Sequence, residues 1–99
     1  KYGLMVNSGS SALILALKIL NFPKGSEIIA PCLNFGTAIS SIILSNLKPI
    51  FVDCEIDTLQ IDIKKIEKKI SKKTRALLIP NLIGNIPNWI EIKKNSLKI

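Results

Sequence analysis

The sequence predicts an α/β fold with a mainly parallel sheet and helices on both faces. Three observations lead to this prediction. Short, continuously apolar runs alternate with longer segments of helical periodicity along the whole chain. Several runs stop at proline or at small polar residues, and no internal repeat or linker interrupts the alternation. Apolar strands separated by helices are typical of parallel sheets that are covered on both faces.

Four strands and four helices are expected, in alternating order. The strands are predicted at residues 4–6, 27–31, 49–53 and 75–79. The helices are predicted at residues 12–20, 35–46, 62–71 and 87–95.

Capping residues support three of these helices. Ser8 is a good N-cap for the first helix, Asn21 supplies its stop, and Asp62 caps the third helix. Pro87 stands near the first turn of the last helix. The 12–20 helix is apolar nearly all round, which predicts that neighbours cover it on most sides.

Composition excludes several classes of protein. A length of 99 residues with 47% hydrophobic residues predicts one small domain rather than a disordered chain. The sequence contains no histidine, which excludes Ser-His-Asp triads, Cys-His dyads and histidine-containing metal sites. No apolar stretch reaches the ~20 residues of a membrane span, and the start does not read as a secretory signal. A cytoplasmic protein without a metal or membrane partner is therefore expected, with Cys32 and Cys54 as buried free thiols.

The net charge of +7 does not by itself predict a nucleic-acid partner. Ile63, Ile66 and Ile70 recur at the spacing of one helix face, and lysines fill the rest of the 62–71 segment. These lysines are interpreted as a solvated helix face, because no aromatic residues are interleaved to stack on bases.

The first candidate ligand segment is the turn at residues 7–11, between a strand and a helix. Gly9 allows close approach of an anion to the backbone, and the hydroxyls of Ser10 and Ser11 add donors. The free N–H groups and the macrodipole of a helix N-terminus favour a phosphate there. A capped helix that binds nothing is the alternative at this point.

Two further loops follow predicted strands and should share the same sheet edge. Phe35, in the 31–38 loop, could stack on a flat ring or cap the core. Asn81 and Asn85, in the 80–87 loop, could bind ligand or shape the turn. In parallel α/β folds ligands bind beyond the carboxyl ends of strands, so the three loops predict the rim of a pocket.

Taken together, these segments resemble the DegT/DnrJ/StrS family of pyridoxal-phosphate (PLP) dependent sugar aminotransferases, which has the type I aminotransferase fold. The resemblance rests on the order and spacing of six segments across nearly the whole chain. They are Val6-Asn7-Ser8-Gly9-Ser10-Ser11-Ala12-Leu13, residues 23–31, Asn34-Phe35-Gly36-Thr37-Ala38, Lys48-Pro49-Ile50-Phe51-Val52-Asp53, residues 57–62, and Lys73-Thr74-Arg75-Ala76-Leu77 with the loop that follows.

The resemblance implies PLP as the cofactor and gives a role to each candidate residue. Gly9 and Ser10 would hold the cofactor phosphate, with Ser11 beside them, and Phe35 would stack on the pyridine ring. Asn81 would lie at the cofactor or substrate, where many members have histidine. No catalytic residue is expected in residues 1–99, because the family's Schiff-base lysine and its pyridine-nitrogen aspartate would lie downstream. The chain would then be part of one PLP-binding large domain, truncated at both ends. In the family's sheet the first strand lies beside strands from later sequence, so residues 4–6 would have no strand neighbour within this chain and the 12–20 helix would lose part of its cover.

The function implied is transfer of an amino group to a nucleotide-linked keto-sugar, in cell-surface polysaccharide or deoxysugar biosynthesis. The partners would be the nucleotide-sugar, an amino donor and a second copy in a homodimer. Residues 7–11 and 84–87 also resemble the deoxysugar 3-dehydratases of the same family, which keep a second reaction open. A small basic interaction or nucleic-acid-binding module is the alternative from a different class, and steep salt dependence of binding would identify it.

Overall fold

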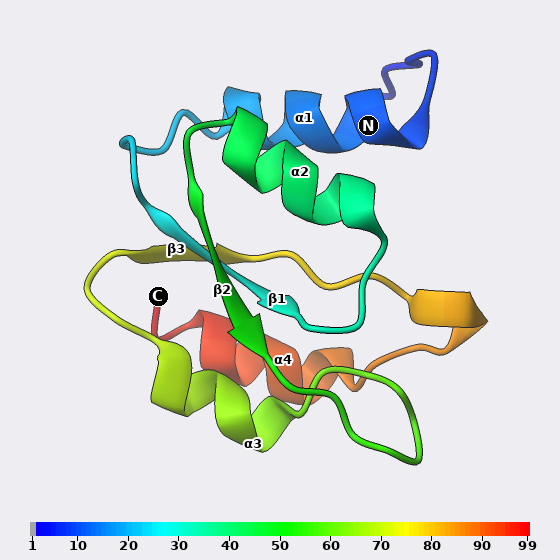
Figure 1. Ribbon diagram of the computed structural model, residues 1–99, viewed down its shortest axis with the longest axis vertical. Coiled ribbons are helices and arrows are strands. Elements are labelled where there is room, and N and C mark those ends of the chain that lie inside the picture. Colours follow the sequence, from blue (N-terminus) through cyan, green and yellow to red (C-terminus); the bar gives the residue numbers. More distant parts are fainter. Residues whose placement is uncertain (1) are drawn as a thin grey trace.

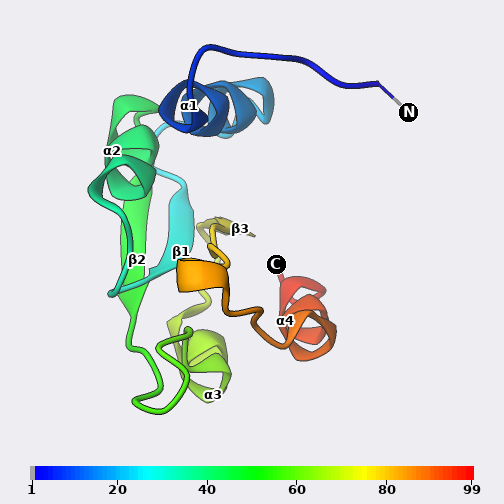
Figure 2. The same ribbon diagram turned by 90° about the vertical axis from the view of Figure 1, so that its right-hand side faces the viewer.

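The computed structural model describes residues 2–99 and has three layers (Figure 1). A sheet of three strands lies in the middle, with α1 and α2 on one face and α3 and α4 on the other, as the side view also shows (Figure 2). The elements are α1 (Gly9–Ile19), β1 (Glu27–Pro31), α2 (Gly36–Leu44), β2 (Lys48–Val52), α3 (Ile63–Ile66), η1 (Glu67–Lys69), β3 (Thr74–Leu77), η2 (Leu82–Gly84) and α4 (Trp89–Ser96). The predicted α/β class with a parallel sheet is confirmed.

The sheet has the order β2-β1-β3, and both strand pairs are parallel. Ile29 of β1 lies opposite Ile50 of β2 and Leu77 of β3. All five residues of β1 are buried, because the strand has a neighbour on each side and helices above and below. This position explains why its sequence is apolar without alternation.

Two hydrophobic cores lie on opposite faces of β1. Ile28 and Ala30 point toward α1 and α2, where they pack with Leu17, Ile42 and Leu47. Ile29 points to the other face and joins a core with Val52, Ile61, Ile66 and Ile92. Successive side chains of a strand point to opposite faces, so one short strand supplies both cores.

The predicted strand at residues 4–6 is not a strand in this structure. Leu4 and Met5 are 74% and 94% exposed, and within residues 2–99 this segment pairs with no strand. Figure 2 shows the segment running away from the sheet. Local sequence can favour an extended run, but only a neighbouring strand can complete its hydrogen bonds.

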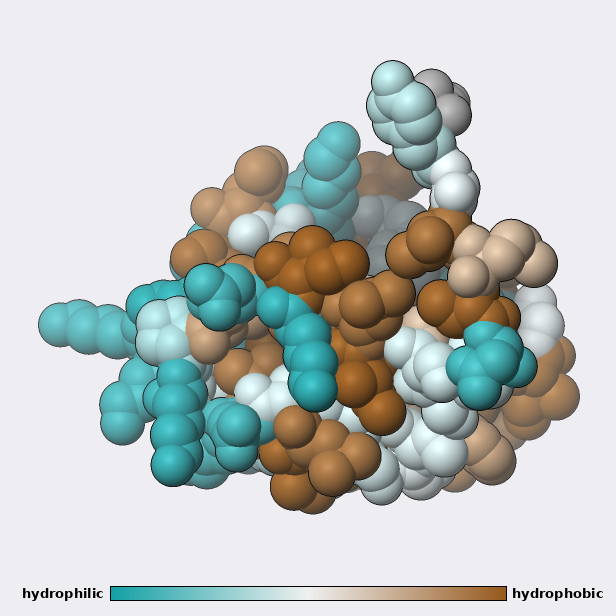
Figure 3. Space-filling model, turned by 90° about the horizontal axis from the view of Figure 1, so that it is seen from above, coloured by the Kyte–Doolittle hydropathy of each residue, from teal (hydrophilic) through white to brown (hydrophobic). Residues whose placement is uncertain are grey.

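Helix α1 begins as predicted but is covered less than predicted. Ser8 is its N-cap and accepts a hydrogen bond from the Ser11 N–H. Leu17 is its only buried residue, whereas Ile19 and Leu20 are exposed. The helix packs against α2 and reaches the sheet through Leu17, and apolar groups gather on the outer surface seen from above (Figure 3). Cover on most sides, as the apolar pattern alone predicts, is corrected for this part of the chain, whereas the partial loss of cover that the family resemblance predicts is observed.

The two later helices differ from the predictions at their ends. Asp62 caps α3 as expected and accepts from the Lys64 N–H, but the α-helix stops at Ile66 and a 3-10 turn follows. Its lysines are exposed, as predicted for a solvated face. Helix α4 begins after Pro87 rather than at it, because Asn88 takes the N-cap position and accepts from the Glu91 N–H at 3.2 Å.

Both cysteines are free thiols, but the predicted burial of Cys32 is wrong. Cys32 follows the end of β1 in an exposed loop, and Cys54 is half-buried. Burial ends with the strand, so the residue after it faces solvent at the sheet edge. Among the residues described, no helix is both long and apolar enough to cross a membrane.

Candidate functional site

The three loops singled out from the sequence lie on the same side of the molecule. Figure 1 shows the start of α1, the start of α2 and η2 together at the right-hand side, beyond the carboxyl ends of β1 and β3. This arrangement follows from the parallel strands, whose carboxyl ends meet at one edge. We call it the carboxyl edge.

The N-terminus of α1 offers two unoccupied N–H donors. Ser8 uses its Oγ to accept from the Ser11 N–H at 3.1 Å and its carbonyl to accept from the Ala12 N–H at 3.0 Å. Within residues 2–99 the N–H groups of Gly9 and Ser10 have no such partner, as expected for the first turn of a helix. No acidic residue stands in this turn to neutralise the positive end of the macrodipole. The turn can therefore bind an anion.

Gly9 is not required by the fold itself. Its φ is not in the left-handed region, unlike those of Gly25 and Gly84. A Cβ added at Gly9 would meet no atom within 4 Å. Neither backbone conformation nor packing inside the described chain calls for glycine here. The open space in front of the backbone is instead suited to a ligand that approaches the N–H groups closely.

A hollow of about 670 Å³ brings Gly9, Ser10 and Phe35 together. Phe35 is 72% exposed and belongs to neither hydrophobic core. It is the N-cap residue of α2, so the start of that helix carries its ring to the hollow. The remaining lining residues are Ala12, Leu13, Ala16 and Thr37. A flat aromatic ring and a helix start with free N–H groups thus border one space.

Ser11 and Asn81 lie elsewhere. The N–H of Ser11 is taken by the cap of its own helix, and its Oγ lies 3.1 Å from the Ser8 Oγ. Ser11 lines a separate hollow of about 440 Å³ on the other side of α1. Asn81 is exposed ahead of η2, where its carbonyl accepts from the Gly84 N–H at 3.3 Å. The structure therefore groups three of the five candidate residues around one hollow.

Asn34 is a polar residue of this edge that the sequence reasoning did not select. Its Oδ1 accepts from the Phe35 N–H at 2.8 Å, and its Nδ2 is enclosed without a partner among the described residues. A buried donor that is left unpaired costs about 1–3 kcal/mol. The only signal in the sequence was an asparagine where the family resemblance has threonine.

The charged groups near this edge have a structural role. The N–H of Cys54, and then Lys65, lower the pKa of the Asp53 carboxyl from its ordinary value. Lys65 lies 3.2 Å from both Asp53 and Asp62, and the hydrogen bonds to these carboxylates raise the pKa of its ammonium group. In residues 2–99 no cluster of three or more histidine, cysteine, aspartate or glutamate residues could hold a metal ion.

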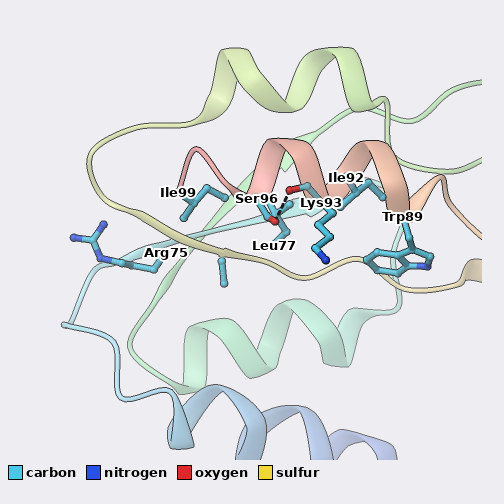
Figure 4. Close-up of a pocket in the computed structure, with 8 residues that line it drawn as sticks. Arg75, Leu77, Trp89, Ile92, Lys93, Ser96 and Ile99 are labelled. Atoms are coloured by element: carbon cyan, nitrogen blue, oxygen red, sulfur yellow. Dashed lines mark hydrogen bonds between the residues drawn. The ribbon is translucent and has the colours of Figure 1, made fainter.

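A third hollow, apolar and of about 480 Å³, lies beside β3 and α4, away from the hollow at Phe35. Leu77, Trp89 and Ile92 line it, together with Lys93 and Ser96, whose Oγ donates to the Lys93 carbonyl at 2.8 Å (Figure 4). β3 has β1 on one side and no second neighbour among the described strands.

Comparison with known proteins decides the family. Residues 1–97 match the model of the DegT/DnrJ/EryC1/StrS aminotransferase family. The chain belongs to this family. GDP-4-keto-6-deoxy-D-mannose 3-dehydratase of Escherichia coli is 39% identical over 95% of the chain and 26% of that enzyme. The dTDP-3-amino-3,6-dideoxy-alpha-D-galactopyranose transaminase of Aneurinibacillus thermoaerophilus is 32% identical over 100% of the chain and 28% of that enzyme.

The fold agrees with that of solved family members. The E. coli GDP-4-keto-6-deoxy-D-mannose-3-dehydratase with bound hydrated PLP superposes with a TM-score of 0.89 at 39% identity, over 96% of this chain and 26% of that one. The chain thus spans about a quarter of the length of these DegT/DnrJ/EryC1/StrS family proteins.

The residues around the hollow shared by Gly9, Ser10 and Phe35 fit PLP. PLP combines a phosphate with a flat, nitrogen-containing ring. The free N–H groups of Gly9 and Ser10 and the space before Gly9 suit the phosphate, and the exposed ring of Phe35 suits the flat part.

Proposed function

We propose that the protein containing this chain is a PLP-dependent enzyme that transfers an amino group to a nucleotide-linked keto-sugar. The observation that supports this most is the hollow shared by Gly9, Ser10 and Phe35, in a chain that belongs to a sugar aminotransferase family. Residues 1–99 would form part of its cofactor-binding domain. The enzyme would act in the cytoplasm as a homodimer, with a nucleotide-sugar and an amino donor as its partners.

The residues of this chain would bind and orient the cofactor. The N–H groups of Gly9 and Ser10, with the Ser10 hydroxyl, would hold the phosphate, and Phe35 would lie against one face of the ring. Two such contacts at different points fix both the place and the tilt of a planar group. When bound, the cofactor supplies an electron sink for negative charge that develops on the substrate carbon next to nitrogen.

A dehydratase is the second candidate reaction. Identity to the E. coli 3-dehydratase is 39%, compared with 32% to the A. thermoaerophilus transaminase. Both reactions would use the same phosphate and ring contacts, so the hollow supports each equally. The family resemblance makes a lysine or histidine outside residues 1–99 the group that separates them.

Product analysis with the complete protein tests the proposal. The purified enzyme should show the absorbance of bound PLP, and it should be incubated with a nucleotide-linked 4-keto-6-deoxysugar and glutamate. Mass spectrometry of an aminotransferase product would show an added amino group with the ring hydroxyls retained. Loss of the hydroxyl at C3 would instead identify the dehydratase. A protein without PLP absorbance that leaves the sugar unchanged would refute both.

A further inference from the structure

The segment between β3 and α4 contains a strained residue at the carboxyl edge. Ile83, inside η2, has φ 56° and ψ 26°, which is the left-handed region. A β-branched residue rarely adopts this conformation, and it persists only where the surroundings impose it. The side chain of Ile83 is 80% exposed, so burial in the described chain does not compensate for the strain.

Two side-chain hydrogen bonds to the 55–60 loop hold the segment in this conformation. Gln60 donates from Nε2 to the Leu82 carbonyl at 3.4 Å, and Asn85 donates from Nδ2 to the Thr58 carbonyl at 3.1 Å. The contacts lie on either side of Ile83 and join positions 22 and 27 residues apart in sequence. Gln60 is only 7% exposed, so water has little access to its amide as an alternative partner.

The 55–60 loop, which these bonds join to the segment, is held by hydrogen bonds of its own. The Glu55 N–H donates to the Gln60 carbonyl at 2.9 Å, and the Gln60 N–H donates to the Thr58 Oγ1 at 3.2 Å. Thr58 in turn donates to Glu55 Oε2 at 3.2 Å. A tight loop at 55–60 therefore fixes the position of residues 82–85.

We propose that Gln60 and Asn85 are positioning residues that set the 81–86 segment as a wall for the sugar of the nucleotide-linked substrate. This inference rests on the proposed function. None of the residues 81–86 lines the hollow shared by Gly9, Ser10 and Phe35, so the segment lies outside the hollow that suits the cofactor. A sugar presents apolar C–H groups and hydroxyls together. The exposed side chains of Ile83 and Asn81 offer the matching apolar and hydrogen-bonding contacts.

The decisive variant, made in the complete enzyme, is Ile83→Gly. Glycine adopts the left-handed region without strain, so the melting temperature should stay level or rise. The substrate wall should loosen and lose its apolar contact, which should raise the KM for the nucleotide-sugar on the order of 10-fold. The absorbance of bound PLP should not change. A residue with only a structural role would not improve stability and weaken substrate binding together.

Ile90→Gly is the matched control. Ile90 is 77% exposed and lies in the regular helix α4, so the same substitution should lower the melting temperature and leave KM unchanged. Asn85→Ala removes one of the two positioning bonds at an exposed residue, and it should raise KM in the same direction as Ile83→Gly. Gln60→Leu should do the same with some loss of stability, because Gln60 is buried.

The outcomes separate this inference from the proposed function. Unchanged KM in both Ile83→Gly and Asn85→Ala, in an enzyme that binds PLP and turns over the sugar, would overturn the inference alone. Loss of PLP from these variants at normal KM would also overturn it, because the wall would then serve the cofactor. A wild-type enzyme that neither binds PLP nor binds the nucleotide-sugar would refute the proposed function, and this inference with it.

Discussion

The two ends of the sheet use their polar groups in opposite ways. At the amino end, Glu27 and Thr74 are buried, Ser71 donates from Oγ to Glu27, and the Ser71 N–H donates to the Thr74 Oγ1 at 2.9 Å. Lys48 lies 3.7 Å from the Glu27 carboxylate. These polar groups satisfy one another within the fold.

The carboxyl edge leaves comparable groups without partners in the described chain. The N–H groups of Gly9 and Ser10 and the Nδ2 of Asn34 are unpaired there, and the ring of Phe35 is exposed. Polar groups that the fold does not use are available to a ligand, in agreement with the general placement of sites in parallel α/β folds. The comparison predicts that substitutions at the amino end change stability, whereas those at the carboxyl edge change cofactor binding.

Gly9→Val should give the largest effect at the carboxyl edge. The added side chain would keep a phosphate from the N–H groups of Gly9 and Ser10, and two charge-assisted hydrogen bonds of about 1.5–3 kcal/mol each would be lost. PLP affinity of the complete enzyme, measured by absorbance titration, should fall accordingly, with little change in melting temperature. Gly36→Val is the control, because Gly36 holds the same first helical position in α2 and also faces open space. Equal PLP loss in both would contradict a specific phosphate site.

Thr74→Val should produce the opposite result at the amino end. The substitution keeps the shape of a side chain that is 1% exposed but removes the acceptor of the Ser71 N–H. The free energy of unfolding should fall by about 1–3 kcal/mol, the range for a buried donor left unpaired. Denaturant unfolding measures this loss, and PLP content at saturation should stay normal. A stable variant with weakened PLP binding would break the comparison between the two ends.

Ser10→Ala should have a moderate effect on binding only. One hydroxyl contact to a charged phosphate would disappear while both N–H groups remain, which should cost about 1.5 kcal/mol of PLP affinity, the low end for a hydrogen bond to a charged group. The same absorbance titration detects this change. Ser11→Ala provides the comparison, since Ser11 is already engaged by Ser8 and lies outside the hollow. An effect at Ser11 equal to that at Ser10 would place the phosphate on the other side of α1.

Phe35→Leu should have a smaller effect, again on the cofactor. Leucine keeps an apolar group but loses the stacking face, which is worth about 0.5–1.5 kcal/mol. PLP affinity should drop by that amount, and the melting temperature should barely move because the ring is 72% exposed. A large loss of thermal stability at normal PLP content would show that the rest of the enzyme buries Phe35 in a core.

Asp53→Asn should give the smallest effect and concerns stability alone. Asp53 lies just beyond β2, and its lowered pKa means that folding stabilises the carboxylate form. That contribution is fully present above the ordinary pKa of 3.8 and is lost as the pH falls through the lower value of the folded state. The stability difference between wild type and Asp53→Asn should therefore disappear in acid. A difference that persists at the lowest pH would contradict this assignment.

The order of elements was predictable because burial on both faces leaves a plain signal in sequence. β1 and the helices around it were recognised from their apolar patterns, and Ser8 and Asp62 were recognised as caps. The residues 4–6 themselves do not reveal their lack of a partner, because a strand's partner is set by topology. The family resemblance does predict it, because in that fold this strand lies beside strands from later sequence. The same reason explains the exposed sides of α1.

The candidate site was predictable only from the rule that ligands of parallel α/β folds bind beyond the carboxyl ends of the strands. The rule brings Gly9, Ser10 and Phe35 to the carboxyl edge, and the structure places all three around one hollow. It could not separate Ser11, although a Ser8 cap already commits the N–H three residues later. The contacts of Asn34, Gln60 and Asn85 depend on tertiary geometry, so no local sequence pattern predicts them.

The middle position of β1 also bears on how the chain folds as it is made. β1 is synthesised before both of its sheet neighbours, β2 and β3. Its apolar residues Ile28, Ile29 and Ala30 therefore leave the ribosome with no strand to pair with on either side. β2 can dock once α2 has crossed over, but the second edge of β1 stays open until β3 emerges. Parallel pairing of this kind is slow and exposes apolar surface for longer, so among the three described strands β1 is the one that most needs protection from aggregation.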